Sequence, residues 1–420
     1  MDFAPSPRAV DLAARVRSFI ETEILPVEAD YHHRAAGIRA SGGDPREPLK
    51  LVDGLRAKAR LEGLWNLWLP ADHEGPYAAR YGTDGDRGLS YVDYAHVAEQ
   101  MGRSFLAPLI FNCNAPDTGN MEVLLRYGDQ AQRDRWLDPL LDGQVRSGFA
   151  MTEPDVASSD ATNMETTAVL DGDEVVINGR KWWTSGAGHP DCTVFIVMAR
   201  SGDPNADRHH QHTMVLVPRD APGLEVERLL PVMGHYDEPL GHGEVVFRNV
   251  RVPRSNVILG EGRAFEIAQG RLGPGRVHHS MRLIGLAEVA LELACRRGWE
   301  RVAFGKPIVN LGGNRERVAT ARIAIDATRL LVLHAAWKLD TYGPLGAINE
   351  VSEIKVAAPR MAQEVVDFAI QMHGGAGLSD DFPLAGAWTE ARALRLADGP
   401  DEVHLGVIAR LELAKYRAQR

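Results

Sequence analysis

Cysteine is scarce in this sequence, and no two cysteines stand close together. Only Cys113, Cys192 and Cys295 occur in the 420 residues, and none belongs to a C-x-x-C pair. Widely spaced cysteines argue for a reducing compartment, and against a disulfide framework or a structural zinc site. Long apolar runs are also missing, since no segment approaches the roughly 18 apolar residues of a membrane-spanning helix.

An excess of positive charge is absent as well. The chain has 47 lysines and arginines against 57 aspartates and glutamates, a net charge of −10. Nucleic-acid binders usually present a basic face, so we expect no nucleic-acid partner. The N-terminus MDFAPSPRAVDLAARV lacks the apolar core of a secretion signal, and the C-terminal AKYRAQR matches no address signal. We therefore expect a cytoplasmic protein that is not bound to a membrane.

Several nucleotide-binding and catalytic signatures are missing too. GAGLSD at 375–380 lacks the third glycine of a dinucleotide fingerprint, and GKP at 305–307 lacks the flanking residues of a phosphate-binding loop. The chain has no GxSxG and no HExxH. Its segment SGDPNADRHHQH is typical of a polar loop between strands, so we expect no metal site there or elsewhere.

What the sequence does contain is a hydrophobic pattern that changes period twice. From residue 8 to about 146 the spacing is helical, as in the apolar face formed by Leu12, Val16 and Phe19. From about 147 to 258 it is that of strands: TTAVLDGDEVVING carries a hairpin turn, and TVFIVMAR, HTMVLVP and GEVVFRNVRV follow.

After residue 259 the pattern is helical again, in long segments joined by short connections. These segments span roughly 261–300, 314–341, 346–373 and 400–418. The Gly-Pro-Gly at 273–275 should break or kink the first of them. We therefore predict an α+β multi-domain chain: an N-terminal all-α domain (1–146), a middle β-barrel or sandwich domain (147–258) and a C-terminal four-helix bundle (259–420).

Four distant segments combine small, aromatic and glycine residues in ways that suit a bound ligand. FAMTEPDVASSDA at 149–161 reads as a strand that enters a loop of hydroxyl and carbonyl groups. NGRKWWTSGAG at 178–188 has two adjacent tryptophans, which on a regular strand would face opposite sides. RVAFGK at 301–306 and QMHGGAG at 371–377 follow, and the glycines of the latter allow a close approach of the backbone.

These segments, in this order, resemble the acyl-CoA dehydrogenase family over residues 10–415. The shared patterns are MTEPxxxSSD, NGxKWWTS, RxxFGK, QxxGGxG and a final Asp-Gly-Pro. Within the family the chain looks closest to the subgroup whose eukaryotic members carry a fused kinase-like domain, which we do not expect here. The resemblance implies the α–β–α fold of that family and bound FAD.

The resemblance also implies roles for individual residues. Trp183 would pack on the flavin ring, and the other cofactor-binding positions would be Met151, Thr152, Ser158, Thr184, Ser185, Arg301, Phe304, Gln371, Gly374, Gly375, Pro400 and Glu402. Of these, Arg301, Phe304, Gln371, Gly374 and Gly375 would reach the flavin of a neighbouring subunit. Ser159 and Gly399 would contact the substrate, an acyl-CoA.

The same resemblance implies partners, and this sequence departs from the family pattern in two places. A homodimer or homotetramer is expected, with an electron-transfer flavoprotein as electron acceptor. The chain has Leu311-Gly312 where the family often has His-Gln after FGK, and Pro400 and Glu402 where it usually has Thr and Gln. Dinucleotide contacts at these places are therefore not implied by the family pattern.

The segment RLADGPDEVH at 395–404 raises the question of the catalytic base. By itself Asp398, before a Gly-Pro helix start, reads as a helix cap. In most relatives, however, a glutamate at this position abstracts the substrate α-proton. The minority position for the base is Gly275 here, next to Arg276, which leaves Asp398 as the candidate and Arg276 as its electrostatic partner. Burial beside an apolar acyl chain should raise the pKa of Asp398.

Three other functions stay open on the sequence alone. Nitroalkane oxidases share this resemblance and also use an aspartate base. Relatives with kinase-like domains process 4-hydroxyacyl-CoAs after phosphorylation. A non-enzymatic DNA-binding flavoprotein is known on the same fold, although the net charge of −10 argues against it here.

Overall fold

A computed structural model of the chain describes residues 1–70, 77–81, 88–201 and 205–417, without the side chains at 78, 269 and 272–274. The described N-terminal part is helical, as predicted. Its α-helices are α1 (Pro7–Phe19), α2 (Leu25–Ser41), α3 (Leu49–Leu61), α4 (Tyr77–Tyr81), α5 (Tyr91–Met101), α6 (Ala107–Ile110), α7 (Asp117–Tyr127), α8 (Gln130–Gln132) and α9 (Asp138–Leu141). Short π-helical turns follow α1 and α8, at Ile20–Ile24 and Arg133–Leu137.

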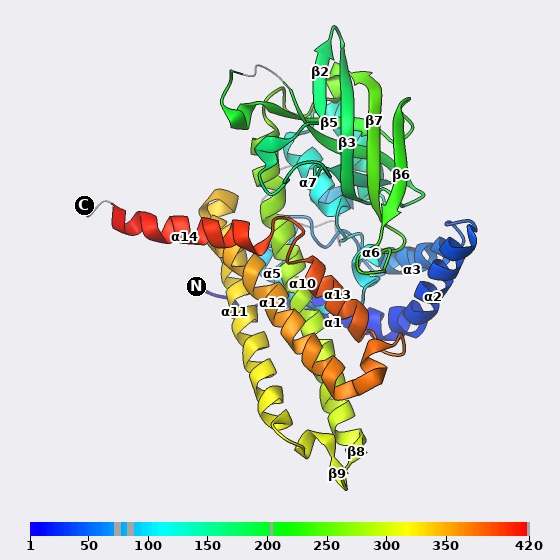
Figure 1. The fold of residues 1–420 in the computed structure, drawn as a ribbon, viewed down its shortest axis with the longest axis vertical. Coiled ribbons are helices and arrows are strands. Elements are labelled where there is room, and N and C mark those ends of the chain that lie inside the picture. Colours follow the sequence, from blue (N-terminus) through cyan, green and yellow to red (C-terminus); the bar gives the residue numbers. More distant parts are fainter. Residues whose placement is uncertain (71–76, 82–87, 202–204, 418–420) are drawn as a thin grey trace.

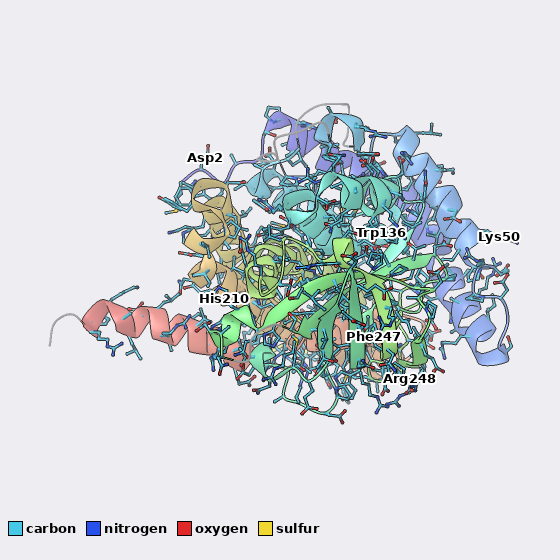
Figure 2. The ribbon with its side chains drawn as sticks, turned by 90° about the horizontal axis from the view of Figure 1, so that it is seen from above. Asp2, Lys50, Trp136, His210, Phe247 and Arg248 are labelled. Atoms are coloured by element: carbon cyan, nitrogen blue, oxygen red, sulfur yellow. The ribbon has the colours of Figure 1, made fainter. Side chains whose placement is uncertain are left out.

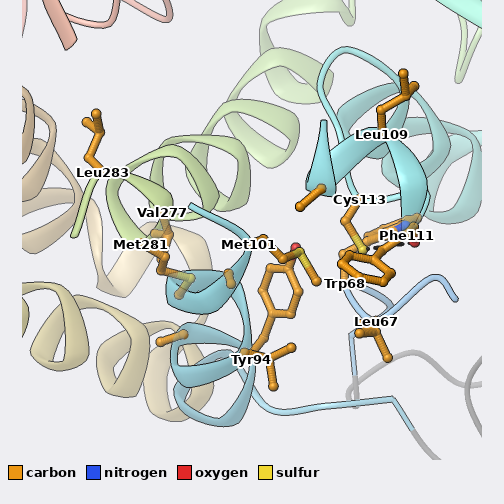
Figure 3. Close-up of a cluster of buried hydrophobic side chains, with 14 of the residues drawn as sticks. Leu67, Trp68, Tyr94, Met101, Leu109, Phe111, Cys113, Val277, Met281 and Leu283 are labelled. Carbon is orange, nitrogen blue, oxygen red and sulfur yellow. Dashed lines mark hydrogen bonds between the residues drawn. The ribbon is translucent and has the colours of Figure 1, made fainter. Parts of the chain in front are cut away.

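Local signals explain where these helices begin. Ser6 caps α1 by accepting a hydrogen bond from the Ala9 amide, and Pro7 occupies the first turn, where its missing N–H is not needed. The apolar face predicted for α1 is buried. Around Tyr94 on α5, side chains from several helices form a closely packed core (Figure 3).

The middle part is one sheet that contains the predicted strands and one further strand, Leu224–Leu230, that was not predicted. They are β1 (Arg146–Ala150), β2 (Thr167–Asp171), β3 (Glu174–Ser185), β4 (Cys192–Arg200), β5 (His212–Pro218), β6 (Leu224–Leu230) and β7 (His242–Pro253). The order is β1-β4-β2-β3-β7-β6, with β5 also paired to β4. The predicted hairpin joins β2 to β3, with Asp171 opposite Glu174 and Gly172 at φ 63° in the turn.

Alternation along β7 shows which face of the sheet is the core. Phe247 is buried, whereas its neighbour Arg248 is exposed and pairs with Glu225 and Glu227 of β6 (Figure 2). The histidine-containing loop is polar, as predicted. Among the described residues no group of three or more His, Cys, Asp or Glu side chains is placed to hold a metal ion.

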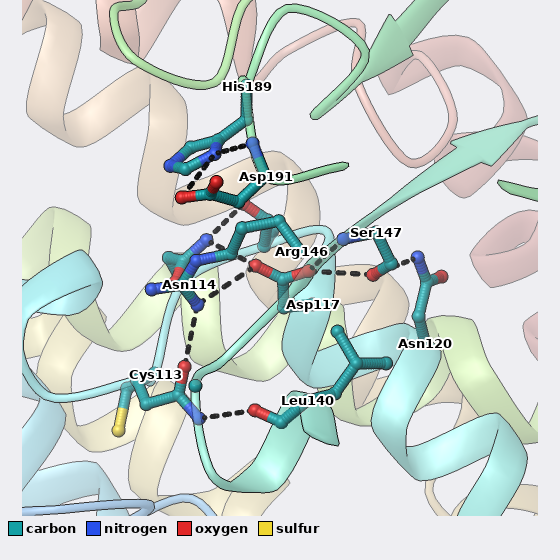
Figure 4. A network of polar contacts seen from close by, with 12 residues as sticks. Cys113, Asn114, Asp117, Asn120, Leu140, Arg146, Ser147, His189 and Asp191 are labelled. Carbon is teal, nitrogen blue, oxygen red and sulfur yellow. Dashed lines mark hydrogen bonds and ion pairs between the residues drawn. The ribbon is translucent and has the colours of Figure 1, made fainter. Parts of the chain in front are cut away.

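A buried polar network joins β1 to the helix α7 (Figure 4). The side chains of Arg146 and Asp117 are each 1% exposed, and Arg146 Nη1 lies 3.4 Å from Asp117 Oδ2. Asp117 also accepts hydrogen bonds from the Ser147 amide (2.8 Å) and hydroxyl (2.6 Å), and Arg146 donates to Asn112 (2.7 Å). A buried charge pair with this many hydrogen bonds fixes the sheet against the N-terminal helices.

The C-terminal part is helical, as predicted. Its long helices are α10 (Ala264–Glu300), α11 (Asn314–Gly346), α12 (Ile348–His373) and α14 (Asp401–Arg417), with the shorter α13 (Leu384–Ala393) before α14. A two-stranded hairpin, β8 (Val302–Ala303) and β9 (Lys306–Pro307), projects at the end far from the sheet (Figure 1). Helix α14 leaves the other helices at an angle and extends outward (Figure 1).

One expectation about this part needs correction. Helix α10 is continuous through the Gly-Pro-Gly at 273–275, because packing against α5, α11 and α12 overrides the local preference for a break. Helix α11 is interrupted instead, at Gly343 with φ 69° before Pro344. Within the described residues, no helix is both long and apolar enough to cross a membrane.

Candidate active site

Asp398 lies in the loop between α13 and α14, in a backbone conformation that residues other than glycine seldom adopt. Its φ is 56°, and the next residue, Gly399, has φ 101°. The Asp398 carbonyl oxygen accepts hydrogen bonds from Arg276 Nε (3.1 Å) and His404 Nε2 (3.2 Å). A non-glycine residue held at positive φ costs free energy, and such strain is concentrated at functional sites.

The Asp398 carboxylate faces α10 rather than the start of α14. Its Oδ2 atom lies 3.7 Å from Nε2 of His279. Burial alone would raise the pKa of Asp398, but the neighbouring His279, Arg271, Arg276 and Lys355 outweigh it and hold the pKa below its ordinary value. Burial and the charge of Arg282 lower the pKa of His279 to about 3, so the lasting positive charges are those of the two arginines and the lysine. The expected increase of this pKa is therefore wrong: the surroundings supply cations as well as low polarity.

Lys355 ties the Asp398 loop to the helix α12. It is 1% exposed, and its Nζ donates to the carbonyl oxygens of Leu394 (2.5 Å) and Gly399 (3.3 Å). Burial lowers the pKa of Lys355 to about 8, while the charge of Asp398 opposes this decrease. The ammonium group therefore both holds the loop and favours the ionised form of Asp398.

The remaining acids at the start of α14 have different surroundings. Asp401 is buried and pairs with Arg360 (3.0 Å) and Arg395 (2.9 Å), so this acid anchors the helix. Glu402 is exposed and Pro400 is half-buried beside it. Asp398 is thus the acid of this segment whose carboxylate faces helix α10.

A second group of predicted residues lies where β1 ends and β3 runs past it. Lys181 of β3 is fully buried, and its Nζ donates to the Met151 carbonyl (2.8 Å) and to Glu153 Oε1 (2.7 Å). Glu153 also accepts from the amides of Glu165 and Thr166. The Trp182 amide donates to the Thr152 carbonyl (2.9 Å), so β3 holds the 151–153 loop by both main-chain and side-chain bonds.

A bulge in β3 places Trp183 at the surface of this region. Between the pairs Lys181–Val245 and Thr184–Gly243 the strand β3 has one extra residue, and Trp183 adopts φ 52°. Its side chain is 40% exposed, and its ring centroid lies 6.2 Å from that of Trp182. The expectation that the two rings lie on opposite faces is therefore wrong, because the bulge breaks strand alternation.

The serines predicted for this region differ in their contacts. Ser158 is occupied locally: its Oγ accepts from the Glu153 amide (2.9 Å) and lies 3.4 Å from the Glu153 carbonyl. Ser159 is exposed. Ser185, at the end of β3, makes a 3.0 Å hydrogen bond with His242 Nδ1, and the neighbouring Thr184 hydroxyl is buried without a partner in the described structure.

A chain of polar neighbours connects the two groups. Asp398 lies beside His279, and His279 Nδ1 is 3.1 Å from a guanidinium nitrogen of Arg282. Arg282 interacts electrostatically with Glu390 of α13, and Glu390 interacts in the same way with His242 of β7. Burial raises the pKa of Glu390 although the side chain is solvent-exposed. We call these five residues, Asp398, His279, Arg282, Glu390 and His242, the central cluster.

Most of the central cluster and its supporting residues could not be identified from sequence alone. His279 belongs to a His-His pair, Lys355 is a lone lysine on the apolar face of α12, and Glu390 stands among ordinary helix residues. The pair at 278–279 was the usable signal, since two adjacent histidines within a long predicted helix require an explanation. The other two become significant only through the contacts that the fold creates.

Five of the predicted residues lie away from the central cluster and from Trp183. Arg301 and Phe304 lie on the β8–β9 hairpin, at the end of the bundle away from the sheet (Figure 1). Gln371, Gly374 and Gly375 lie at the end of α12, near the same end (Figure 1). All five are exposed, and Phe304 is 94% exposed.

Comparison with known families covers almost the whole chain. Residues 6–144, 148–250 and 262–413 match, in turn, the N-terminal, middle and C-terminal domains of acyl-CoA dehydrogenase. The mouse protein "Acyl-CoA dehydrogenase family member 11" is 49% identical over 98% of this chain, and this chain spans about half (51%) of the mouse protein.

Two mycobacterial proteins match over their full length. "Probable acyl-CoA dehydrogenase FadE2" of Mycobacterium tuberculosis is 48% identical over 100% of this chain and 98% of its own. A solved structure from Mycobacterium abscessus, whose name assigns it provisionally to the acyl-CoA dehydrogenases, is 64% identical, covers 98% of this chain and 100% of its own, and has a TM-score of 0.91. The chain therefore belongs to the acyl-CoA dehydrogenase family, whose members are oxidoreductases that act on acyl-CoA.

Proposed function

We propose that the chain catalyses α,β-dehydrogenation of an acyl-CoA to the trans-2-enoyl-CoA, with Asp398 as the base that takes the α-proton. The observation that carries this proposal is the placement of Asp398. Its carboxylate belongs to the central cluster, its main chain is held in a strained conformation, and nearby cations keep it ionised. A base must be ionised before the substrate proton reaches it.

The residues around Trp183 fit the FAD that members of this family bind. The Trp183 ring offers an exposed flat face, and the Thr184 hydroxyl and Trp182 Nε1 are buried polar atoms without a partner in the described structure. Met151, Thr152 and Ser185 border the same place. When bound there, FAD supplies the acceptor for the hydride that leaves the β-carbon.

Other residues of this chain position the Asp398 loop and stabilise its carboxylate. Arg276 and His404 fix the Asp398 main chain, and Lys355 holds the loop through Gly399. The three cations Arg271, Arg276 and Lys355 stabilise the carboxylate, so protonation of Asp398 loses this stabilisation. A thioester carbonyl polarised by hydrogen-bond donors must supply the compensating acidity of the α-carbon.

At the other position that the family uses for the base, this chain has Gly275, which has no side chain. A Cβ atom built on Gly275 would meet no atom within 4 Å. Nothing at this position competes with Asp398 for the role of base. Arg276, the next residue, contacts the Asp398 loop directly and acts as a positioning residue in this proposal.

A homodimer or homotetramer is part of the proposal, as are a cytoplasmic location and an electron-transfer flavoprotein as acceptor. Arg301, Phe304, Gln371, Gly374 and Gly375 lie far from Trp183 within one chain (Figure 1). They can contact a flavin only if it is held by another subunit. The strongly exposed Phe304 on a projecting hairpin supports such an association.

The test is a substrate panel read by bleaching of the flavin absorbance under anaerobic conditions. Acyl-CoAs of graded length, 4-phosphoacyl-CoAs and small nitroalkanes are compared at equal concentration. Reduction by plain acyl-CoAs, with a trans-2-enoyl-CoA product, supports the proposal. Reduction by nitroalkanes alone, or a DNA complex in a salt-dependent shift assay without any flavin reduction, contradicts it.

A further inference from the structure

Ser185 and His242 are directly opposed at the edge of the sheet where Trp183 is exposed. Ser185 ends β3 and His242 begins β7, and the two residues are cross-strand partners. Their side chains are joined by a 3.0 Å hydrogen bond between Ser185 Oγ and His242 Nδ1. The imidazole also lies beside the Trp183 ring, with 5.8 Å between centroids.

The direction of this hydrogen bond depends on which imidazole nitrogen carries the proton. Asp237 Oδ2 lies 3.5 Å from His242 Nε2, on the side away from Ser185. A carboxylate there favours a proton on Nε2, which leaves Nδ1 as an acceptor. Because Nδ1 can then only accept, the Ser185 hydroxyl must be the donor.

We propose that His242 is a positioning residue that fixes Ser185 as a hydrogen-bond donor to its own Nδ1, so that Ser185 presents a lone pair to a group bound against Trp183. This inference rests on the proposed function, in which that group is the flavin. A flavin gains an N–H on its polar edge when it is reduced. A serine oxygen that can only accept a hydrogen bond there favours the reduced form over the oxidised form.

The charged groups that face His242 support a neutral imidazole. Burial lowers the pKa of His242, and Glu390 of α13 only partly offsets this effect. Burial and Glu238 raise the pKa of Asp237 to about 6, while His32 of α2 opposes them, so Asp237 is ionised near pH 7.5. Arg282 of α10 lowers the pKa of Glu390 from the other side.

The segment that carries Asp237 is fixed at both ends. The Gly241 amide donates to the Asp237 carbonyl (2.8 Å), and the Gly186 amide donates to the Gly241 carbonyl (3.0 Å). The next residue, Glu238, pairs with Arg39 of α2, whose guanidinium stacks on Tyr236 at 3.8 Å. Asp237 is therefore held beside His242 by the N-terminal helices as well as by the sheet.

The first test measures the flavin reduction equilibrium in the holoenzyme. His242→Phe should lower the ratio of reduced to oxidised flavin at fixed potential up to about tenfold, which is about 1.4 kcal/mol and the upper end of what one hydrogen bond contributes. For a two-electron couple this corresponds to about 30 mV. His242→Asn, which keeps an acceptor near the Nδ1 position, should stay within about threefold of wild type, and His235→Phe, an exposed histidine of the same segment, should change nothing.

The pairing with Ser185 gives the decisive comparison. In a Ser185→Ala background, His242→Phe should have no further effect on the reduction equilibrium, because the hydroxyl it positions is gone. An equal effect in both backgrounds would overturn the proposal, as would a flavin-bound His242→Phe variant with the wild-type equilibrium.

The apoprotein separates this inference from the proposed function. Nitrogen-15 NMR of histidine-labelled protein, with His242→Asn for assignment, should show a proton on Nε2 and none on Nδ1 at pH 7.5. A proton on Nδ1 overturns the inference whether or not flavin binds. A wild-type protein that binds no FAD, but shows the expected tautomer, contradicts the proposed function while leaving the hydrogen-bond direction supported.

Discussion

Arg276 contacts Asp398 through the main chain: its Nε donates to the Asp398 carbonyl at 3.1 Å, and no ion pair joins it to the carboxylate in the described structure. The guanidinium thus positions the loop without occupying the carboxylate oxygens. Its charge still lowers the pKa of Asp398, together with that of Lys355. A carboxylate that is ionised but not blocked suits a group that must accept a proton.

Lys355→Met should shift the pH dependence of kcat/KM. Loss of a positive charge next to Asp398 makes protonation easier, so the pKa of Asp398 rises and the acid limb moves to higher pH. Wild-type Lys355 itself loses its charge near pH 8, so the two proteins should converge above that pH. Lys415→Met on the exposed end of α14 is the control, and an unmoved acid limb in Lys355→Met contradicts this electrostatic account.

Lys181→Met should destabilise the fold by about 3–5 kcal/mol, because it leaves the buried Glu153 carboxylate without its ion partner. The double variant Lys181→Met/Glu153→Gln should recover more than half of this loss, since the uncompensated charge is removed. Denaturant unfolding of the apoprotein measures both. Arg251→Met, which breaks a surface pair with Asp171 and Glu174, should have little effect. Equal losses in the single and double variants would show that packing, not charge, dominates.

Trp183→Ala should weaken FAD binding by about 1–3 kcal/mol, a dissociation constant roughly 5- to 150-fold higher, because a large aromatic surface is lost. Trp182→Ala is the matched comparison on the same bulge. We expect it to weaken binding less, since its ring is less exposed than that of Trp183. Flavin fluorescence on titration of apoprotein reports both values. A larger loss in Trp182→Ala would mean that Trp182, not Trp183, faces the cofactor.

Phe304→Asp should disrupt the oligomer, because it puts a charge on the most exposed aromatic side chain of the projecting hairpin. Light scattering after gel filtration should show a smaller assembly, and bound FAD should fall with it if subunits share the cofactor. Leu61→Asp, at a residue 90% exposed on α3, is the control and should change neither. A wild-type-sized assembly of Phe304→Asp with full FAD content would contradict a role for this hairpin between subunits.

Periodicity was sufficient for the architecture but not for its irregular places. The spacing of Leu12, Val16 and Phe19 predicted the buried face of α1, and the turn at Asp171-Gly172 predicted the β2–β3 hairpin. The bulge at Trp183 could not be predicted, because Trp-Trp-Thr satisfies a regular strand equally well. The facing of these rings depends on one extra residue relative to β7, which only strand pairing reveals.

The same distinction applies to the candidate site: residues in short motifs could be predicted, and residues that meet only after folding could not. Asp398, Trp183 and Ser185 could be chosen from short motifs, since each lies in a recognisable segment. The charge around Asp398 could not, because His279 and Lys355 come from separate helices and meet only after folding. For that reason burial alone predicted the wrong direction for the pKa of Asp398.

The most direct test of the proposed chemistry is anaerobic flavin reduction by acyl-CoA in Asp398→Asn. This variant keeps the size of the side chain but cannot take the α-proton, so it should bind FAD and acyl-CoA and yet reduce the flavin slower by several orders of magnitude. Glu412→Gln, at an exposed position further along α14, should reduce it at nearly the wild-type rate. Wild-type bleaching in Asp398→Asn would show that another group takes the proton and would contradict the assignment of Asp398 as the base.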